Sequence, residues 1–234
     1  KYGSDAMRWF LMSSPILRGG NLIVTEDGIR DTVRQIMLPV WSSYYFFTLY
    51  ANAANHGDGY DARTLRADEV PGLPQMDRYL LARTRKLIAN VTEHMDNFEI
   101  SDACDEVADF IDMLTNWYIR NTRDRFWNED ENAFNTLYTV LEAFMRVLAP
   151  LAPMEAEAVW RGLTGGDSVH LGDWPYLTDP QTGVDTALGK VLVEDGALVE
   201  AMDKVREIVS STLSLRKAHK MRVRQPLAKL TVVV

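Results

Sequence analysis

The sequence predicts an all-α helix bundle with roughly two-thirds of its residues in helices. Two long segments place their hydrophobic residues on one face of a helix. Segments that contain glycine and proline separate the helical ones. The chain of 234 residues is 47% hydrophobic and 25% charged, which is typical of a globular protein that buries a core without disulfides or metals.

The first half of the chain alternates mixed segments with helices. Residues 1–24 form a short mixed segment interrupted by glycine and proline. A helix is expected over residues 25–50, because Thr25 is a suitable N-cap, and Pro39 should kink this helix. Residues 52–74 contain three glycines and two prolines, so they are expected to form a loop.

Two later helices have clear buried faces. After a helix at residues 76–96, the helix that begins at Ser101 or Asp102 carries one narrow hydrophobic stripe of Val107, Phe110, Ile111, Leu114 and Tyr118. The helix at residues 130–149 carries a second stripe, made of Ala133, Leu137, Leu141, Phe144 and Leu148. We expect these two faces to form the core of the bundle.

The last part of the chain is expected to contain a short helix that ends near Gly162, a long loop over residues 164–185 and a helix over residues 197–219. The final LTVVV has the pattern of a strand, so we expect a terminal strand there. Such an ending, together with an equally abrupt start, suggests a fragment of a longer protein. The predicted domains are residues 1–24, 25–185 and 186–234.

Several function classes are not supported by the sequence. The single cysteine, Cys104, cannot form an internal disulfide or supply a zinc site, and its acidic surroundings should raise its pKa. Neither a phosphate-binding glycine loop nor a pair of histidines at metal-ligand spacing is present. No segment has the length and hydrophobicity of a membrane span. We therefore expect no catalytic residue, cofactor or metal in this chain, and a protein of the cytoplasm that does not associate with membranes.

Charge is unevenly distributed along the chain. The net charge of -8 disfavours nucleic-acid binding when taken alone. However, eight acids and neither lysine nor arginine lie within residues 91–112, whereas five bases and no acid lie within residues 216–224. Because docking depends on local charge, the second segment can still contact phosphates. A competing explanation is that its cations stabilise the end of a helix.

The segment NWYIRNTRDRFW, residues 116–127, combines aromatic and basic side chains. Arg120, Arg123 and Trp127 point away from the buried stripe, where arginine can pair with phosphate and both residue types can stack on unpaired RNA bases. Arg125 falls on the stripe itself, so either the helix bends before it or Arg125 pairs with an acid of the bundle. The alternative for the whole segment is structural, with Trp117 and Tyr118 in or beside the core.

Two further basic stretches extend the predicted RNA-binding surface, one on the helix at residues 76–96 and one at residues 215–227. The predicted RNA-binding residues are Arg83, Arg120, Arg123, Arg125, Trp127, Lys217, Arg222 and Arg224.

Several motifs in this sequence resemble class I aminoacyl-tRNA synthetases for branched-chain amino acids. The segment NWYIRNTRDRFW looks like a helix of their anticodon-binding domain, and YGSDAMRWFLMSSPI looks like the segment after the catalytic lysine loop. The other matching motifs are MDRYLLARTRKLI, VLAPLAPMEAEAVW, SVHLGDWP and VRQPL. The sequences of these motifs are most similar to the isoleucyl members, while valyl and leucyl members remain alternatives. Position 121, often basic in this family, is Asn121 here.

This resemblance implies a helix bundle that binds the anticodon arm of tRNA(Ile), preceded by a piece that contacts the inside of the tRNA. It implies a monomer within a longer ligase whose catalytic domain uses ATP and magnesium, with zinc as a further candidate. The ATP-binding signatures are absent from this chain, so the fragment should be inactive by itself. The competing hypothesis is a helical scaffold or interaction domain whose arginines serve structure.

Overall fold

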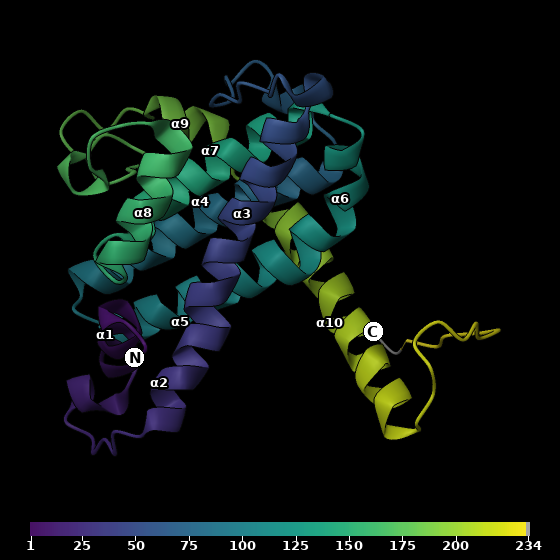
Figure 1. The fold of residues 1–234 in the computed structure, drawn as a ribbon, viewed down its shortest axis with the longest axis horizontal. Helices are drawn as coiled ribbons and strands as arrows, with labels where there is room; N and C mark the ends of the chain where they lie inside the picture. The colour runs from purple at the N-terminus through teal and green to yellow at the C-terminus, as the bar shows by residue number, and fades with distance from the viewer. Residues whose placement is uncertain (233–234) are drawn as a thin grey trace. The chain divides into compact units, whose positions relative to one another are not determined.

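The computed structural model describes residues 1–232, and 68% of the chain is helical (Figure 1). This confirms the predicted all-α class. The chain divides into two compact units, one of Lys1–Glu194 and one from Asp195 onward. The predicted domain boundaries at residues 24 and 185 remain predictions. Within the described residues, no helix combines the length and hydrophobicity needed to cross a membrane.

The first unit contains nine of the α-helices that the structure describes. Their bounds are α1 Ser4–Met12, α2 Glu26–Thr32, α3 Leu38–Ala53, α4 Gln75–Asp96, α5 Ile100–Asp112, α6 Arg120–Trp127, α7 Glu131–Leu148, α8 Pro153–Thr164 and α9 Ala187–Val191. Helix α4 packs against α5 and α7, and α7 packs in turn against α3 and α8. The second unit contains α10, Gly196–Ala218, which begins and ends one residue before the predicted helix.

The two predicted stripes form the centre of the first unit. All ten of their residues are at most 2% exposed. Edge-to-face aromatic contacts extend this core, because Phe126 of α6 lies 5.0 Å from Phe46 of α3 and 5.3 Å from Phe134 of α7, measured between ring centroids. Such contacts add to the stabilisation from burial. The core therefore joins α6 directly to its neighbours.

The first 24 residues are more ordered than the sequence predicted. Helix α1 buries Ala6 and Trp9 and packs against α2, α5 and α8. The guanidinium of Arg8 donates to the carbonyl of Pro150 at 2.9 Å. This segment is therefore part of the bundle surface, and α1 and α2 lie at the same end of the unit (Figure 1).

The helix predicted over residues 25–50 forms in three parts. The hydroxyl of Thr25 accepts a hydrogen bond from the amide of Gly28, which confirms the predicted N-cap. Between α2 and α3 lies a π-helical segment, Val33–Met37. Pro39 has no N–H to donate to the carbonyl four residues earlier, and the wider π turn just before it accommodates this loss. The predicted kink is thus a local change of helix type.

The predicted terminal strand is wrong for residues 230–232, which form no strand, while Val233 and Val234 lie outside the described residues. A strand needs a partner to bond its backbone groups. Over residues 1–232 the strand-like pairing consists of one isolated bridge, between Thr178 and Asp185 in the predicted long loop. That loop also contains a short 3-10 turn, Val169–Leu171.

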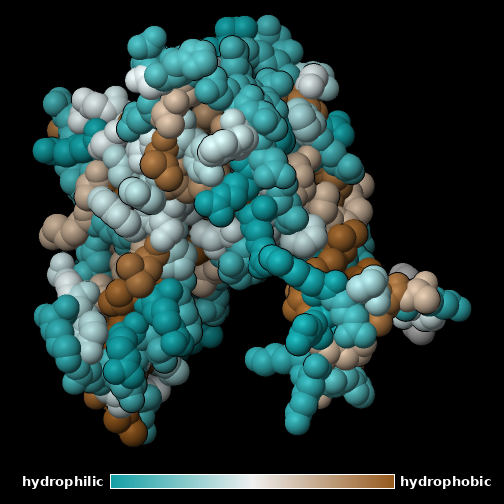
Figure 2. All heavy atoms as spheres, turned by 45° about the vertical axis from the view of Figure 1, so that its right-hand side comes forward, coloured by the Kyte–Doolittle hydropathy of each residue, from teal (hydrophilic) through white to brown (hydrophobic). Residues whose placement is uncertain are grey.

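Much of the surface seen in Figure 2 is hydrophilic, with hydrophobic patches between the polar regions. One row of exposed apolar and aromatic residues follows α3 and consists of Leu38, Trp41, Tyr45 and Leu49.

Candidate nucleic-acid interface

The aromatic–basic segment lies on a helix that changes its geometry midway. Helix α5 runs into a π-helical segment, Met113–Ile119, which continues as α6. A π turn contains more residues than an α turn, so the residues of α6 do not follow the wheel set by α5. Tyr118, at the end of the stripe, is fully buried, and its hydroxyl donates to Asp77 of α4 at 2.8 Å.

Arg125 is held inside the bundle by two acids. Its two terminal nitrogens donate to both carboxylate oxygens of Asp77, each at 2.7 Å, and Nε donates to Asp130 at 2.8 Å. Asp77 is fully buried, and Asp130 also caps the first turn of α7 through the amide of Asn132 at 2.9 Å. A forked, bidentate pair of this kind fixes both side chains in one orientation.

The pKa values of Tyr118 and Arg125 are both shifted by the buried carboxylate of Asp77 beside them. Burial raises the pKa of Tyr118 well above its usual value, and the neighbouring carboxylate of Asp77 raises it further. Burial acts to lower the pKa of Arg125, but hydrogen bonds to Asp77 and Asp130 outweigh it, so the pKa is raised. Both explanations offered for the position of Arg125 therefore hold: the helix changes geometry before it, and it pairs with acids. We treat Arg125 as a structural residue instead of an RNA contact.

Arg120, Arg123 and Trp127 are exposed as predicted, although the π-helical segment shifts α6 relative to the wheel set by α5. The indole of Trp127 is 75% exposed although it is a large apolar side chain. Arg120 has no ion-pair partner among residues 1–232. These three residues form a row at the surface of α6, which we call the α6 row.

Two aromatic residues of α3, which the sequence reasoning missed, support the α6 row. The hydroxyl of Tyr50 accepts a 3.4 Å hydrogen bond from Nε of Arg123 and raises the pKa of this arginine. The guanidinium of Arg123 also lies over the ring of Phe46, 6.0 Å from its centroid. Phe46 and Tyr50 are four residues apart, so their shared helix face was available as a signal. Within residues 1–232, Arg123 donates only through Nε, so both of its terminal nitrogens can bind an outside partner.

Other residues of the segment have internal roles. Trp117 is half-buried, and its indole N–H is buried without a hydrogen-bond partner. The amide of Asn121 donates to the carbonyl of Trp117 at 2.7 Å. The partial burial of Trp117 fits the expectation that it lies beside the core.

Arg83 also serves the fold. It is 8% exposed and forms an ion pair with Asp109, which joins α4 to α5. Its neighbour Arg85 donates to the carbonyls of Gly189 and Leu192, at 3.1 and 2.9 Å, and so fixes the end of α9. Two arginines of the predicted basic stretch on α4 therefore serve the fold.

In the second unit, Lys217, Arg222 and Arg224 are all exposed. The last acid before them is Glu207, and no acid follows it in the chain. These three cations are available to bind phosphate.

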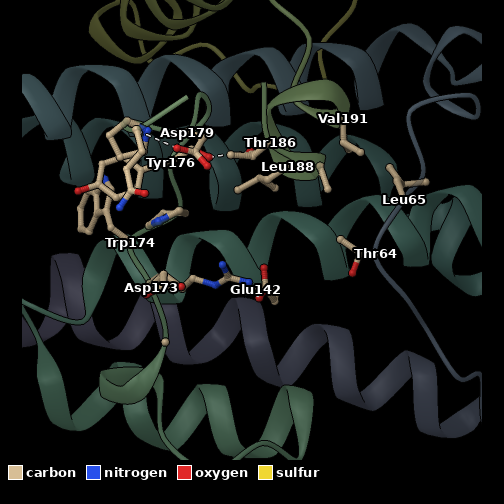
Figure 3. A pocket seen from close by; sticks show the side chains of 16 residues that line it. Thr64, Leu65, Glu142, Asp173, Trp174, Tyr176, Asp179, Thr186, Leu188 and Val191 are labelled. Carbon is tan, nitrogen blue, oxygen red and sulfur yellow. Dashed lines mark hydrogen bonds and ion pairs between the residues drawn. The ribbon is translucent and has the colours of Figure 1, made fainter. Parts of the chain in front are cut away.

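A pocket of about 900 Å³ lies between α7 and the loop that leads to α9 (Figure 3). Trp174 and Tyr176 lie together on one side of it, and Leu188 and Val191 lie farther along. Glu142 pairs with Arg146 at its wall. The lining residues include neither histidine, lysine, serine nor cysteine.

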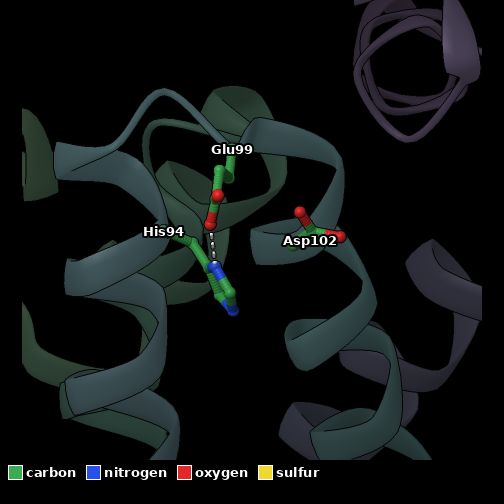
Figure 4. A group of neighbouring side chains, drawn as sticks. All are labelled: His94, Glu99 and Asp102. Atoms are coloured by element: carbon green, nitrogen blue, oxygen red, sulfur yellow. Dashed lines mark hydrogen bonds and ion pairs between the residues drawn. The ribbon is translucent and has the colours of Figure 1, made fainter. Parts of the chain in front are cut away.

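His94, Glu99 and Asp102 lie close enough to share a metal ion, with one ligand atom from each within 4.8 Å of the others (Figure 4). Sequence spacing did not reveal this group. Nδ1 of His94 is 2.8 Å from a carboxylate oxygen of Glu99, and Asp102 forms an ion pair with Arg18. One carboxylate oxygen of Asp102 is therefore already paired with a guanidinium.

Cys104 is buried, and burial raises the pKa of its thiol to about 12, with Asp105 adding to the effect. This confirms the predicted direction. A thiol of this kind is not a nucleophile near neutral pH.

Comparison with known proteins adds to this geometry. Residues 77–233 match the family described as the anticodon-binding domain of tRNA ligase. Isoleucine--tRNA ligase of Bifidobacterium longum is 80% identical and matches the whole chain, which covers 21% of that protein. The corresponding ligases of Leifsonia xyli and Mycobacterium tuberculosis are 52% and 50% identical over 99% of the chain, which covers 19% and 20% of them. The chain thus spans about a fifth of these relatives.

The fold also has a solved counterpart. The crystal structure of a ternary LeuRS–tRNA–LeuAMS complex from Agrobacterium radiobacter superposes with a TM-score of 0.55 over 82% of this chain and 20% of that one, at 17% identity. This similarity concerns the fold. Because the family match covers most of the chain, the chain belongs to the anticodon-binding domain family of tRNA ligases.

Proposed function

We propose that this chain is the tRNA-binding part of an isoleucine–tRNA ligase and that it binds the anticodon arm of tRNA(Ile). The observation that carries this proposal is the α6 row. Arg120, Arg123 and Trp127 are exposed on a helix that the core and the Arg125–Asp77 pair hold firmly. The family match and the names of the relatives support the same partner.

The chemistry of the α6 row suits single-stranded RNA. The forked guanidinium of Arg123 can donate two hydrogen bonds to a phosphate while Tyr50 fixes its orientation from behind. The exposed ring of Trp127 can stack on an unpaired base of the anticodon loop. Arg120 adds a second cation one helical turn before Arg123. Lys217, Arg222 and Arg224 add further phosphate contacts.

The relatives favour the isoleucyl member over the valyl and leucyl alternatives, since the similar sequences at 50–80% identity are isoleucine--tRNA ligases. The longer protein would carry out ATP-dependent aminoacylation in a catalytic domain outside this chain. ATP, magnesium and zinc belong by resemblance to that longer protein. We expect it to act as a monomer in the cytoplasm.

Titration of the chain with tRNA(Ile) and with an unrelated tRNA, at several salt concentrations, tests this proposal. We expect tighter binding of tRNA(Ile) and a linear fall of log affinity with log salt, because each phosphate contact releases counterions. Equal and negligible binding of both tRNAs at low salt would contradict the proposal.

A further inference from the structure

Arg216 differs from the other bases of the terminal segment because it points inward. It lies in the last turn of α10, and its Nη1 donates to the carbonyls of Arg222, Val223 and Gln225 at 2.9, 3.1 and 2.8 Å. These acceptors lie six to nine residues later, so the chain after the helix folds back around one guanidinium.

Backbone bonds complete this turn, which we call the basic turn, residues 216–225. The amide of Met221 donates to the carbonyl of Arg216 at 2.8 Å, and that of Gln225 donates to Arg222 at 3.0 Å. Lys220 has a φ of 54°, in the left-handed region, as residues that end helices often do. Residues 226–232 form neither helix nor strand.

The basic turn brings like charges together, and this needs a cause. Lys217, Lys220, Arg222 and Arg224 are exposed, and no acid in the chain follows Glu207. Repulsion between these cations favours an open chain. Three carbonyl dipoles that converge on one point also repel each other unless a cation lies between them. The guanidinium of Arg216 supplies that cation, so it stabilises a turn that is otherwise unfavourable.

Resting on the proposed function, we propose that Arg216 is a positioning residue: it preorganises the basic turn so that Lys217, Arg222 and Arg224 meet successive phosphates of the tRNA. In this role Arg216 acts through its Nη1, which is taken up by backbone carbonyls. Preorganisation removes part of the ordering cost that a flexible basic tail meets on binding.

The test compares Arg216→Ala and Arg216→Lys with Lys229→Ala in the full 234-residue chain. Arg216→Lys keeps the charge but replaces the planar fork with a shorter-reaching ammonium. Lys229→Ala removes one charge from the same segment outside the basic turn. Amide protection of Met221 and Gln225, measured by hydrogen exchange or NMR, reports the turn, and tRNA titration reports the affinity.

We expect both Arg216 variants to lose amide protection at Gln225 and to bind tRNA on the order of tenfold more weakly, while Lys229→Ala keeps the turn and most of the affinity. Helicity of α10 should be unchanged, which separates the turn from the helix. A variant that keeps wild-type protection or affinity after loss of Arg216 overturns the inference, whereas failure of the unchanged chain to bind any tRNA overturns the proposed function with it.

Discussion

The α6 row and the basic turn are both exposed and basic, but they achieve this in different ways. On α6, the exposed cations lie on a helix that is held in place. Arg125 pairs with Asp77 and Asp130, and Arg123 contacts Tyr50 and Phe46. The sequence of the basic turn contains no acid, and one arginine binds backbone carbonyls instead. An arginine in a basic motif can therefore stabilise the fold, bind the partner or shape a loop, according to its acceptors.

The largest expected effect concerns the buried ion pair that holds α6 in place. Replacing Arg125 with Ala leaves the fully buried carboxylate of Asp77 without its partner, and breaking a buried pair in this way typically costs about 3–5 kcal/mol. We expect a loss of this size in the free energy of unfolding, measured by urea titration. Arg161→Ala is the matched control, since Arg161 forms an exposed ion pair within α8. A loss equal to that of the control would show that the pair does not support α6.

A second prediction concerns the pH dependence of the stability of the first unit. Burial, followed by the charge of Asp5, raises the pKa of Glu155 from 4.5 to about 8. Asp5 also accepts the amide of Glu155 at 2.8 Å, which joins α1 to α8. Below pH 4.5 Glu155 is protonated in both states, and the stability is fully present. Between pH 4.5 and 8 only the folded state keeps the proton, so stability falls as pH rises, and this contribution is lost above pH 8.

This fall should appear in the thermal unfolding of the first unit and not in the helicity of α10. Glu155→Gln, which keeps a neutral side chain at every pH, should flatten the profile. An unchanged pH profile in this variant would assign the dependence to other groups.

A third prediction concerns recognition by the α6 row. Trp127→Ala should weaken tRNA binding by about 1–3 kcal/mol, the usual contribution of one base stacked on an aromatic ring. Stability should hardly change, because the indole is 75% exposed. Trp127→Phe should restore part of the affinity. Loss of stability without loss of affinity would favour the helical scaffold hypothesis.

The smallest expected effect concerns single cations of the basic turn. Lys217→Ala or Arg224→Ala should reduce the slope of log affinity against log salt by about 0.7–0.9 for each phosphate that the variant no longer neutralises. The preference for tRNA(Ile) over other tRNAs should stay the same, since phosphates carry no sequence information. A loss of preference would show that these residues read bases.

The sequence predicted the elements that depend on local pattern. The buried stripes of α5 and α7 and the N-cap at Thr25 all formed, because spacing and capping are properties of neighbouring residues. The sequence did not reveal the contacts that join residues far apart in the chain. The pairing of Arg125 with Asp77 joins positions 48 residues apart, and the support of Arg123 by Tyr50 joins positions 73 apart.

The sequence did not predict three further features correctly, although it carried a signal for one of them. Helix α1 lies in the segment that was predicted to be mixed, and its buried Ala6 and Trp9 are three residues apart, as on one helix face. The terminal LTVVV has strand propensity, but propensity does not supply a partner strand, and none is formed by residues 1–232. The inward direction of Arg216 depends on a turn that no spacing rule describes.

The most direct test of the central claim is the triple variant Arg120→Ala, Arg123→Ala and Trp127→Ala, compared with Arg161→Ala for both tRNA(Ile) affinity and thermal stability. If the α6 row binds the anticodon arm, the triple variant loses most of its affinity for tRNA(Ile) and unfolds at nearly the wild-type temperature, while the control is unchanged in both. Unchanged affinity together with a lowered unfolding temperature would contradict the account and assign the α6 row to the fold.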